Sequence, residues 1–249
     1  MSPMPDTQVH WRLDRPAEGF YSAELAEPAQ PIRTFLPEGY EPRYPYPLIV
    51  LFHRSGSNEE QVLKLAPRMS RRNFVAVSLR GQERMPEGTG DQPAYGWGQG
   101  PDAVERVTDY LLRAVEQTRR SYHIHTERVY LVGIGDGADI AYRTAFALGD
   151  RIAGVAALNG SVPRATHGEP VFRLDKVRGM KVFMAHGLGN EDVPFDTAAR
   201  DRRLFYAAGA DVRLNAYATA HKLHAEMFKD LNKWVIGHVN AGVNVFARK

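Results

Sequence analysis

The fold is decided by one stretch of the chain, Arg128-Val129-Tyr130-Leu131-Val132-Gly133-Ile134-Gly135-Asp136-Gly137-Ala138-Asp139-Ile140-Ala141. The apolar run at residues 129–132 predicts a buried strand, and the pattern after the glycines predicts a helix from Asp136 to about Leu148. Glycine occurs two positions before and two positions after Gly135. This spacing is typical of a sharp strand-to-helix turn, in which larger side chains beside the apex would collide.

A strand that passes directly into a helix through this glycine pattern resembles the nucleophile elbow of the α/β hydrolases. In that superfamily the apex carries Ser, Cys or Asp, whereas here the apex is Gly135. Glycine takes the strained backbone conformation of an apex at little steric cost. The resemblance therefore implies an esterase frame that lacks its nucleophile.

Composition excludes several classes of protein. The chain has 249 residues, of which 43% are hydrophobic and 24% charged, values that suit one ordinary globular domain. The net charge is +3, and the basic residues are scattered as pairs instead of forming a stripe, so we expect no nucleic-acid partner. There is no cysteine, which excludes disulfides, thiolate zinc sites and a cysteine nucleophile.

The sequence also predicts no membrane partner. No apolar run reaches membrane-spanning length, and the first residues lack the charged-then-apolar pattern of a secretory signal. We therefore expect a cytoplasmic protein.

Strand and helix patterns alternate along the chain. Apolar runs predict strands at residues 32–36, 47–53, 74–79, 129–132, 152–158, 181–185 and 212–217, and helical periodicity predicts helices at 58–69, 101–121, 136–148, 197–208 and 223–239. This alternation predicts an α/β fold, a doubly wound and mostly parallel sheet with helices on both faces. We expect one domain at residues 32–240, a lead-in or edge strands at 1–31 and a tail at 241–249.

Two further segments resemble the carboxylesterase/phospholipase branch of the α/β hydrolases. The segment at residues 53–60 resembles the oxyanion loop HGxGxNEE, with His53 and Gly56 matching and Arg54 replacing a glycine. In the glycine- and proline-rich segment at residues 82–100, Trp97 stands where relatives carry an aromatic side chain that walls the substrate cleft.

The remaining triad positions follow in the order nucleophile, acid and base. Residues 186–194 resemble the segment HGxxDxxVP that delivers the acid, and they place Asn190 at the aspartate position. Residues 220–226 resemble GHxxSPE and place His221 at the base position. The chain thus resembles the α/β hydrolases near the carboxylesterase/phospholipase/acyl-thioesterase group over about residues 32–240, and members of that group often pair as homodimers.

The chemistry implied by these positions is impaired. Gly135 has no atom that can attack a carbonyl carbon, so an acyl-enzyme cannot form there. Asn190 has no negative charge to stabilise an imidazolium, and the same change in serine proteases costs about four orders of magnitude in rate. The resemblance therefore predicts a pseudoenzyme with a degenerate catalytic triad.

An oxyanion hole is made by backbone N–H groups, here expected from Ser55 and Asp136, and it does not depend on the lost side chains. With His53, Arg54 and Trp97 around it, the cleft is expected to bind a small carbonyl or anionic ligand. Arg54 either strengthens such binding or plugs the site. The alternative is a carboxylic-ester hydrolase that uses a non-standard nucleophile or a water activated by His221; Ser55, Ser57 and Ser161 offer hydroxyl groups.

Three other interpretations fit less well. Asp136 as a displaced nucleophile would put Ile134 and Ala138 where small residues are required, and a carboxylate there suits the first turn of a helix. A dinucleotide fingerprint at residues 133–138 lacks the acidic residue that should end the next strand. A zinc site formed by His53, His186, His221 and His224 competes with loop-bracing roles for these histidines. We expect neither a cofactor nor a metal.

Overall fold

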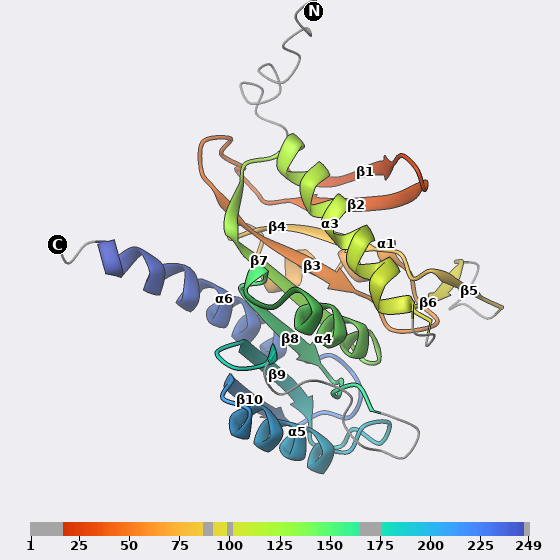
Figure 1. Cartoon of the computed structure of the whole chain (residues 1–249), viewed down its shortest axis with the longest axis vertical. Coiled ribbons are helices and arrows are strands. Elements are labelled where there is room, and N and C mark those ends of the chain that lie inside the picture. The colour runs from red at the N-terminus through yellow and green to blue at the C-terminus, as the bar shows by residue number, and fades with distance from the viewer. Residues whose placement is uncertain (1–16, 87–91, 99–101, 165–175, 247–249) are drawn as a thin grey trace, which may run out of the picture.

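The computed structural model describes residues 17–86, 92–98, 102–164 and 176–246 of the chain, and its architecture is shown in Figure 1. An eight-stranded sheet has the order β1-β2-β4-β3-β7-β8-β9-β10. The first two strands are antiparallel to their neighbours, and the other six run parallel. The strands are β1 (Gly19–Leu25), β2 (Gln30–Leu36), β3 (Tyr46–Phe52), β4 (Val75–Leu79), β7 (Ile124–Ile134), β8 (Gly154–Leu158), β9 (Lys181–Gly187) and β10 (Asp211–Tyr217).

Helices cover both faces of this sheet (Figure 1). The helices are α1 (Glu59–Leu63), α2 (Ala66–Met69), α3 (Ala103–Ser121), α4 (Gly137–Leu148), α5 (Phe195–Ala207) and α6 (Ala225–Phe246). Side chains on β3 alternate between the two layers. Val50 belongs to the apolar cluster that contains residues of α3, α4 and α5, whereas Leu51 belongs to the cluster that contains residues of α1, α2 and α6. The predicted doubly wound, mostly parallel α/β fold is confirmed.

Several element boundaries differ from the predicted ones. The helix predicted at residues 58–69 is divided into α1 and α2, because Pro67 has no N–H group to continue the ladder from α1. The segment at 82–100 contains a short hairpin of β5 (Glu83–Met85) and β6 (Ala94–Gly96), although part of it lies outside the described residues.

The two ends of the chain also differ. The last helix, predicted to end at residue 239, continues through Phe246, so most of the predicted tail is helical. No proline follows residue 239 to stop a helix. At the other end β1 supplies an edge strand of the sheet, while residues 1–16 of the lead-in lie outside the described residues.

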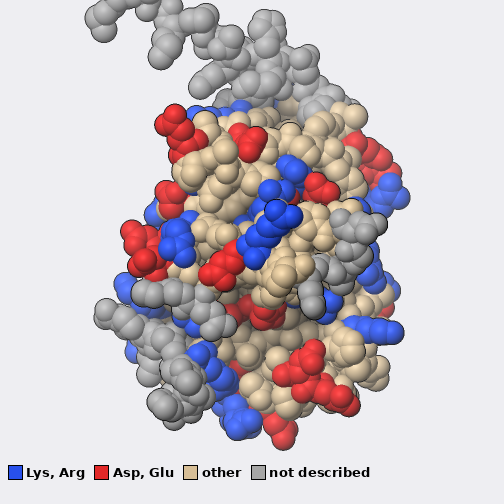
Figure 2. Space-filling model, turned by 90° about the vertical axis from the view of Figure 1, so that its right-hand side faces the viewer, with Lys and Arg blue, Asp and Glu red and all other residues tan. Residues whose placement is uncertain are grey.

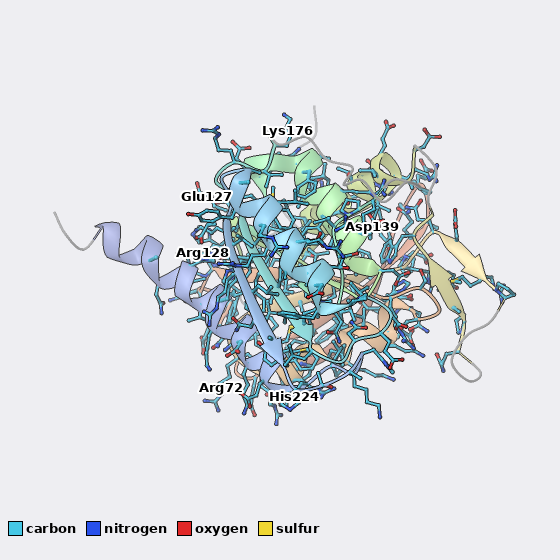
Figure 3. All side chains as sticks on the ribbon, turned by 90° about the horizontal axis from the view of Figure 1, so that it is seen from below. Arg72, Glu127, Arg128, Asp139, Lys176 and His224 are labelled. Carbon is cyan, nitrogen blue, oxygen red and sulfur yellow. The ribbon has the colours of Figure 1, made fainter. Side chains whose placement is uncertain are left out.

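The predicted elbow lies in the middle of the sheet. Its strand, β7, is hydrogen-bonded to β3 on one side and to β8 on the other. In Figure 3, Glu127 and Arg128 mark the amino-terminal part of β7, and Asp139 on α4 lies toward the other side of the molecule. Reactive groups of open α/β sheets sit beyond the carboxyl ends of the strands, which is where the elbow is placed.

No helix among the described residues is long and apolar enough to cross a membrane.

Candidate active site

Gly135 is the apex of the turn between β7 and α4. Its φ angle is +57°, in the left-handed region that glycine adopts at little cost. The turn is closed by hydrogen bonds from the Gly135 N–H to the Leu158 carbonyl at 2.9 Å and from the Ala138 N–H to the Gly135 carbonyl at 3.1 Å. Helix α4 begins at Gly137 and not at Asp136, which is its N-cap residue.

The two flanking glycines are required by close backbone packing. A Cβ atom on Gly133 would lie 2.3 Å from the Ala138 Cα, and one on Gly137 would lie 2.4 Å from the His53 carbonyl oxygen. Both contacts are with backbone atoms, which cannot turn aside as a flexible side chain can. Gly133 is therefore required because the start of α4 lies against the end of β7, and Gly137 is required because α4 lies against the end of β3.

A cleft of about 860 Å³ is lined by the residues at all three predicted triad positions. Asn190 and His221 line it with Gly135. Basic and acidic side chains alternate over the face of the molecule shown in Figure 2. The other lining residues are Arg54, Ser55, Arg68, Ile134, Asp136, Asp139, Asn159, Ser161, Val162, Arg164, Asp192, Val193, Lys222 and Leu223.

Arg54 is exposed and lies directly over the apex. A Cβ atom on Gly135 would approach the Arg54 Cβ to 3.3 Å, and apart from the adjacent residues of the chain no other described residue lies within 4 Å of it. A serine at the apex would therefore contact Arg54 at once. The replacement of a glycine by Arg54 in the oxyanion loop thus narrows the space in which a nucleophile would stand.

The expected oxyanion hole is occupied by the protein itself. The Ser55 N–H donates to Oδ1 of Asp136 at 2.8 Å, so one of the two predicted donors already holds a carboxylate oxygen. This contact involves neither of the lost triad side chains, so the prediction that the hole does not depend on them stays a prediction. The Asp136 side chain folds back over the turn because an N-terminal helix position brings it beside the β3–α1 loop, 81 residues away in sequence.

Asn190 is buried and directed toward its own loop. Its Oδ1 accepts hydrogen bonds from the N–H groups of Asp192 at 3.1 Å and Val193 at 3.2 Å. Its Nδ2 lies 3.5 Å from Nε2 of His186. No hydrogen bond joins Asn190 to His221 within the described part of the chain, so Asn190 does not orient that ring.

His221 is exposed and is held through its backbone. Its carbonyl accepts a hydrogen bond from Nδ2 of Asn159 at 2.9 Å, while Oδ1 of Asn159 accepts from the Gly187 N–H at 2.9 Å. Asn159 has a φ angle of +57°, which asparagine tolerates better than most residues. Asn159 was missed as a site residue, although an Asn-Gly pair at the end of a strand is a signal for a constrained turn.

His53 and Trp97 support the site from below, so they are not lining residues of this cleft. The side-chain Nε2 of His53 accepts a hydrogen bond from the Gly81 N–H at 2.9 Å. The backbone carbonyl of His53 accepts one from Nε1 of Trp97 at 2.7 Å. Burial lowers the pKa of His53, which keeps the ring neutral and able to accept this bond. Trp97 lines a smaller neighbouring pocket of about 250 Å³ that shares Ser55 and Asp136 with the cleft.

A buried ion pair fixes the helix that follows the oxyanion loop. Glu59 is 1% exposed and accepts two hydrogen bonds from Arg80, at 2.5 and 3.0 Å. The Arg80 guanidinium lies over the Tyr95 ring, 4.8 Å from its centroid. These contacts join α1, the end of β4 and β6 beneath the cleft.

A second buried carboxylate, also missed at the sequence level, holds a cation in the cleft. Asp201 on α5 is fully buried, forms an ion pair with Arg164 and accepts a hydrogen bond from the Val162 N–H at 3.0 Å. Burial raises the pKa of Asp201. Nothing local marks such a residue, because its partners lie 37 and 39 positions away in the chain.

The four histidines considered for zinc do not form a metal centre. Within the described ranges, no three His, Asp or Glu side chains are grouped so that they could hold a metal ion. His186 instead donates from Nε2 to the Val193 carbonyl at 2.7 Å, and burial lowers its pKa. His224 is exposed at the edge of the molecule (Figure 3).

The sheet order and the elbow define an α/β-hydrolase fold. Residues 42–239 match the phospholipase/carboxylesterase family model, and the chain belongs to that family. No curated protein matches the sequence.

Solved structures share the fold at low sequence identity. A carboxylesterase from Mesorhizobium loti is 18% identical with a TM-score of 0.69, over 87% of this chain and 99% of its own. An esterase from Rhizomucor miehei is 13% identical with a TM-score of 0.70, over 94% and 87% of the two chains. YahD, solved with malic acid, is 17% identical with a TM-score of 0.58, over 78% and 94%.

Proposed function

We propose that this protein is a non-catalytic member of the phospholipase/carboxylesterase family that binds a small carbonyl or anionic ligand in the cleft above Gly135. The observation that carries the proposal is the glycine at the apex of an otherwise complete elbow. No attacking atom is attached at the position where the family's fold presents one, so acyl transfer through an elbow nucleophile is not available.

Two further contacts support the loss of ordinary hydrolase chemistry. Asp136 occupies the Ser55 N–H that would stabilise an oxyanion. Removing one such donor from a working hydrolase costs about 10²–10³ in kcat. Asn190 binds its own loop and not the base at His221. Each of these three features weakens a different part of the catalytic machinery.

Ligand binding remains available to this cleft. Its volume of about 860 Å³ lies within the range of small-molecule sites, about 300–1,000 Å³. Polar groups from several loops converge on it, beside apolar walls. The structural relative YahD was solved with an organic acid, malic acid, which agrees with an anionic ligand.

The alternative is a carboxylic-ester hydrolase that uses another hydroxyl or a water activated by His221. The observation in its favour is that Ser161 and His221 line the same cleft. In this case the mechanism would need neither Gly135 nor Asn190.

Turnover of p-nitrophenyl acetate and butyrate separates the two functions. We expect no turnover above buffer in the parent protein or in His221→Ala, and no labelling of any serine by a fluorophosphonate. His224→Ala is the matched control, because His224 is exposed and does not line the cleft. Turnover that is lost in His221→Ala and kept in His224→Ala would establish the hydrolase and end the proposal.

A homodimer and a cytoplasmic location are also part of the proposal. Light scattering after size exclusion would give about twice the chain mass of 27.9 kDa for a dimer, and the single mass would reject it. Fractionation of the producing cells tests the location.

A further inference from the structure

One donor of the cleft already binds a carboxylate. The Ser55 N–H donates to Oδ1 of Asp136 at 2.8 Å, a normal distance for a charge-assisted hydrogen bond. Asp136 is an exposed residue, so its side chain can turn into solvent without breaking core packing. The Ser55 N–H group can therefore bind a carboxylate oxygen, and the carboxylate of a ligand could replace that of Asp136.

A second donor of the cleft lacks an acceptor. Asn190 is 4% exposed, and its Nδ2 meets only Nε2 of His186, at 3.5 Å, among the described residues. That His186 nitrogen lies 2.7 Å from the Val193 carbonyl and donates to it, so it cannot also accept from the amide. Asn190 also lines the cleft, and its N–H₂ group has no good acceptor among the described residues, whereas an aspartate would offer only acceptors there.

The charged side chains that line the cleft suit a ligand with a single negative charge. Arg54, Arg68, Arg164 and Lys222 line it together with Asp136, Asp139 and Asp192. Two of these charges are compensated, since Asp139 pairs with Arg143 on α4 and Arg164 pairs with Asp201. Among the described residues, three cations and two carboxylates remain, so a monoanion balances their charge better than a dianion does.

The remaining walls are apolar. Ile134, Val162, Val193 and Leu223 line the same cleft, which is larger than a carboxylate group alone requires. If the ligand carried a hydrocarbon portion beside its charged group, that portion would pack against these side chains. Each CH₂ group removed from water would strengthen binding by roughly 0.8 kcal/mol.

We propose that the cleft binds an organic monocarboxylate with an apolar body, whose carboxylate takes hydrogen bonds from Ser55 and Asn190 and displaces the Asp136 side chain. Asp136 then acts as an internal competitor that weakens binding. This inference rests on the proposed non-catalytic function, and it gives the two replaced triad positions a common purpose: Gly135 leaves room for the ligand and Asn190 supplies a donor.

Isothermal titration calorimetry with sodium hexanoate tests the ligand class. The matched probes are 1-hexanol, which has the same chain without the charge, and inorganic phosphate, which has charge without the chain. At constant ionic strength we expect heat of binding for hexanoate alone. Stronger binding of phosphate or of hexanol than of hexanoate would overturn the assignment.

Two substitutions should change hexanoate affinity in opposite directions. Asp136→Ala removes the competitor, so affinity should rise about three- to tenfold, the effect of one hydrogen bond that no longer has to be exchanged. Asn190→Asp keeps the oxygen that accepts from Asp192 and Val193 but replaces the donor by a charge, so affinity should fall about tenfold or more.

Matched variants control for net charge. Asp211→Ala and Asn240→Asp make the same two charge changes at exposed residues that do not line the cleft, and they should leave affinity unchanged. Circular dichroism checks that each variant is folded. Binding that is equal in Asp136→Ala, Asn190→Asp and the parent would overturn the inference.

The outcomes separate this inference from the proposed function. Absence of both hexanoate binding and ester turnover refutes the carboxylate site while the protein remains non-catalytic. Ester turnover that depends on His221 refutes the proposed function instead, whatever the affinity for hexanoate.

Discussion

At the residue scale, the glycine at position 135 is matched to the backbone conformation of the turn. Gly135 has a φ angle of +57°, and a Cβ atom added to it would lie 3.3 Å from the Cβ atom of Arg54. A residue with a side chain would be destabilised there both by the left-handed backbone conformation and by the close contact with Arg54. We therefore expect glycine at this position to stabilise the fold relative to any residue with a side chain.

We therefore predict that Gly135→Ser lowers the free energy of unfolding by about 1–3 kcal/mol. Urea denaturation followed by circular dichroism measures the change. Gly179→Ser is the matched control, because Gly179 has a φ angle of +75° and open space around its Cα, so that variant reports the backbone cost alone. An unchanged urea midpoint for Gly135→Ser would mean that the apex carries no strain.

Restoring serine at the apex and aspartate at position 190 would not by itself restore all the groups that ester hydrolysis needs. Gly135→Ser with Asn190→Asp rebuilds the nucleophile and the acid but leaves the Ser55 N–H bound to Asp136. We predict that adding Asp136→Ala to this pair raises ester turnover at least tenfold over the double variant, because a donor for the oxyanion becomes free. The turnover of p-nitrophenyl butyrate by the two variants checks this, and equal rates would contradict the role assigned to Asp136.

At the scale of elements, the elbow is a contact between a helix and a strand. Helix α4 starts so close to the end of β3 that a Cβ atom on Gly137 would lie 2.4 and 2.6 Å from the carbonyl oxygens of His53 and Phe52. With a side chain at residue 137, α4 would have to shift as a unit away from β3, and its packing against the sheet would be disturbed. The position of α4 therefore requires a residue without a side chain, glycine, at position 137.

Two glycines in helices should accordingly respond in opposite directions to alanine. We predict that Gly137→Ala lowers the free energy of unfolding by about 3 kcal/mol or more, since the overlap is with backbone. Gly237→Ala in α6, where nothing lies within 4 Å of the added atom, should raise it by about 0.5–1 kcal/mol through helix propensity. Denaturant unfolding of the two proteins provides the comparison, and a loss in both would show that α6 is not free at Gly237.

At the scale of the whole molecule, burial of polar groups beneath the cleft makes stability depend on pH. Burial lowers the pKa of His53 and of His186 below the ordinary value of 6.5. Below pH 6.5 the unfolded chain therefore binds more protons than the folded protein does. The resulting contribution to stability is complete above pH 6.5 and is lost as the pH falls through the folded-state pKa values.

We predict that the urea midpoint falls as the pH is lowered from about 7.5 to about 5, the range in which histidine titrates. His186→Gln should make this decline shallower, because the glutamine amide can replace the Nε2 donor to Val193 without titrating. His125 and His238, whose pKa values burial also lowers, account for part of the decline that remains. The exposed His224→Gln should keep the parent's slope, and an equal slope in all three proteins would refute this origin.

The sequence by itself determined the features that depend on local pattern. The apolar runs identified the parallel strands, and the glycine spacing around Gly135 identified the elbow, because burial and steric exclusion act on neighbours in the chain. The same patterns placed Gly135, Asn190 and His221 after strand ends that meet at one edge of the sheet, so their shared cleft was foreseeable.

Only the tertiary structure decided which groups face one another in that cleft. Asp136 and Ser55 are 81 residues apart, Asp201 and Arg164 are 37 apart, and no local pattern marks either pair. The direction of the Asn190 side chain likewise depends on its loop and not on its position in a motif. Side-chain hydrogen bonds between distant segments are selected by packing, and for this reason the hydrogen bond from Ser55 to Asp136 emerged only from the folded chain.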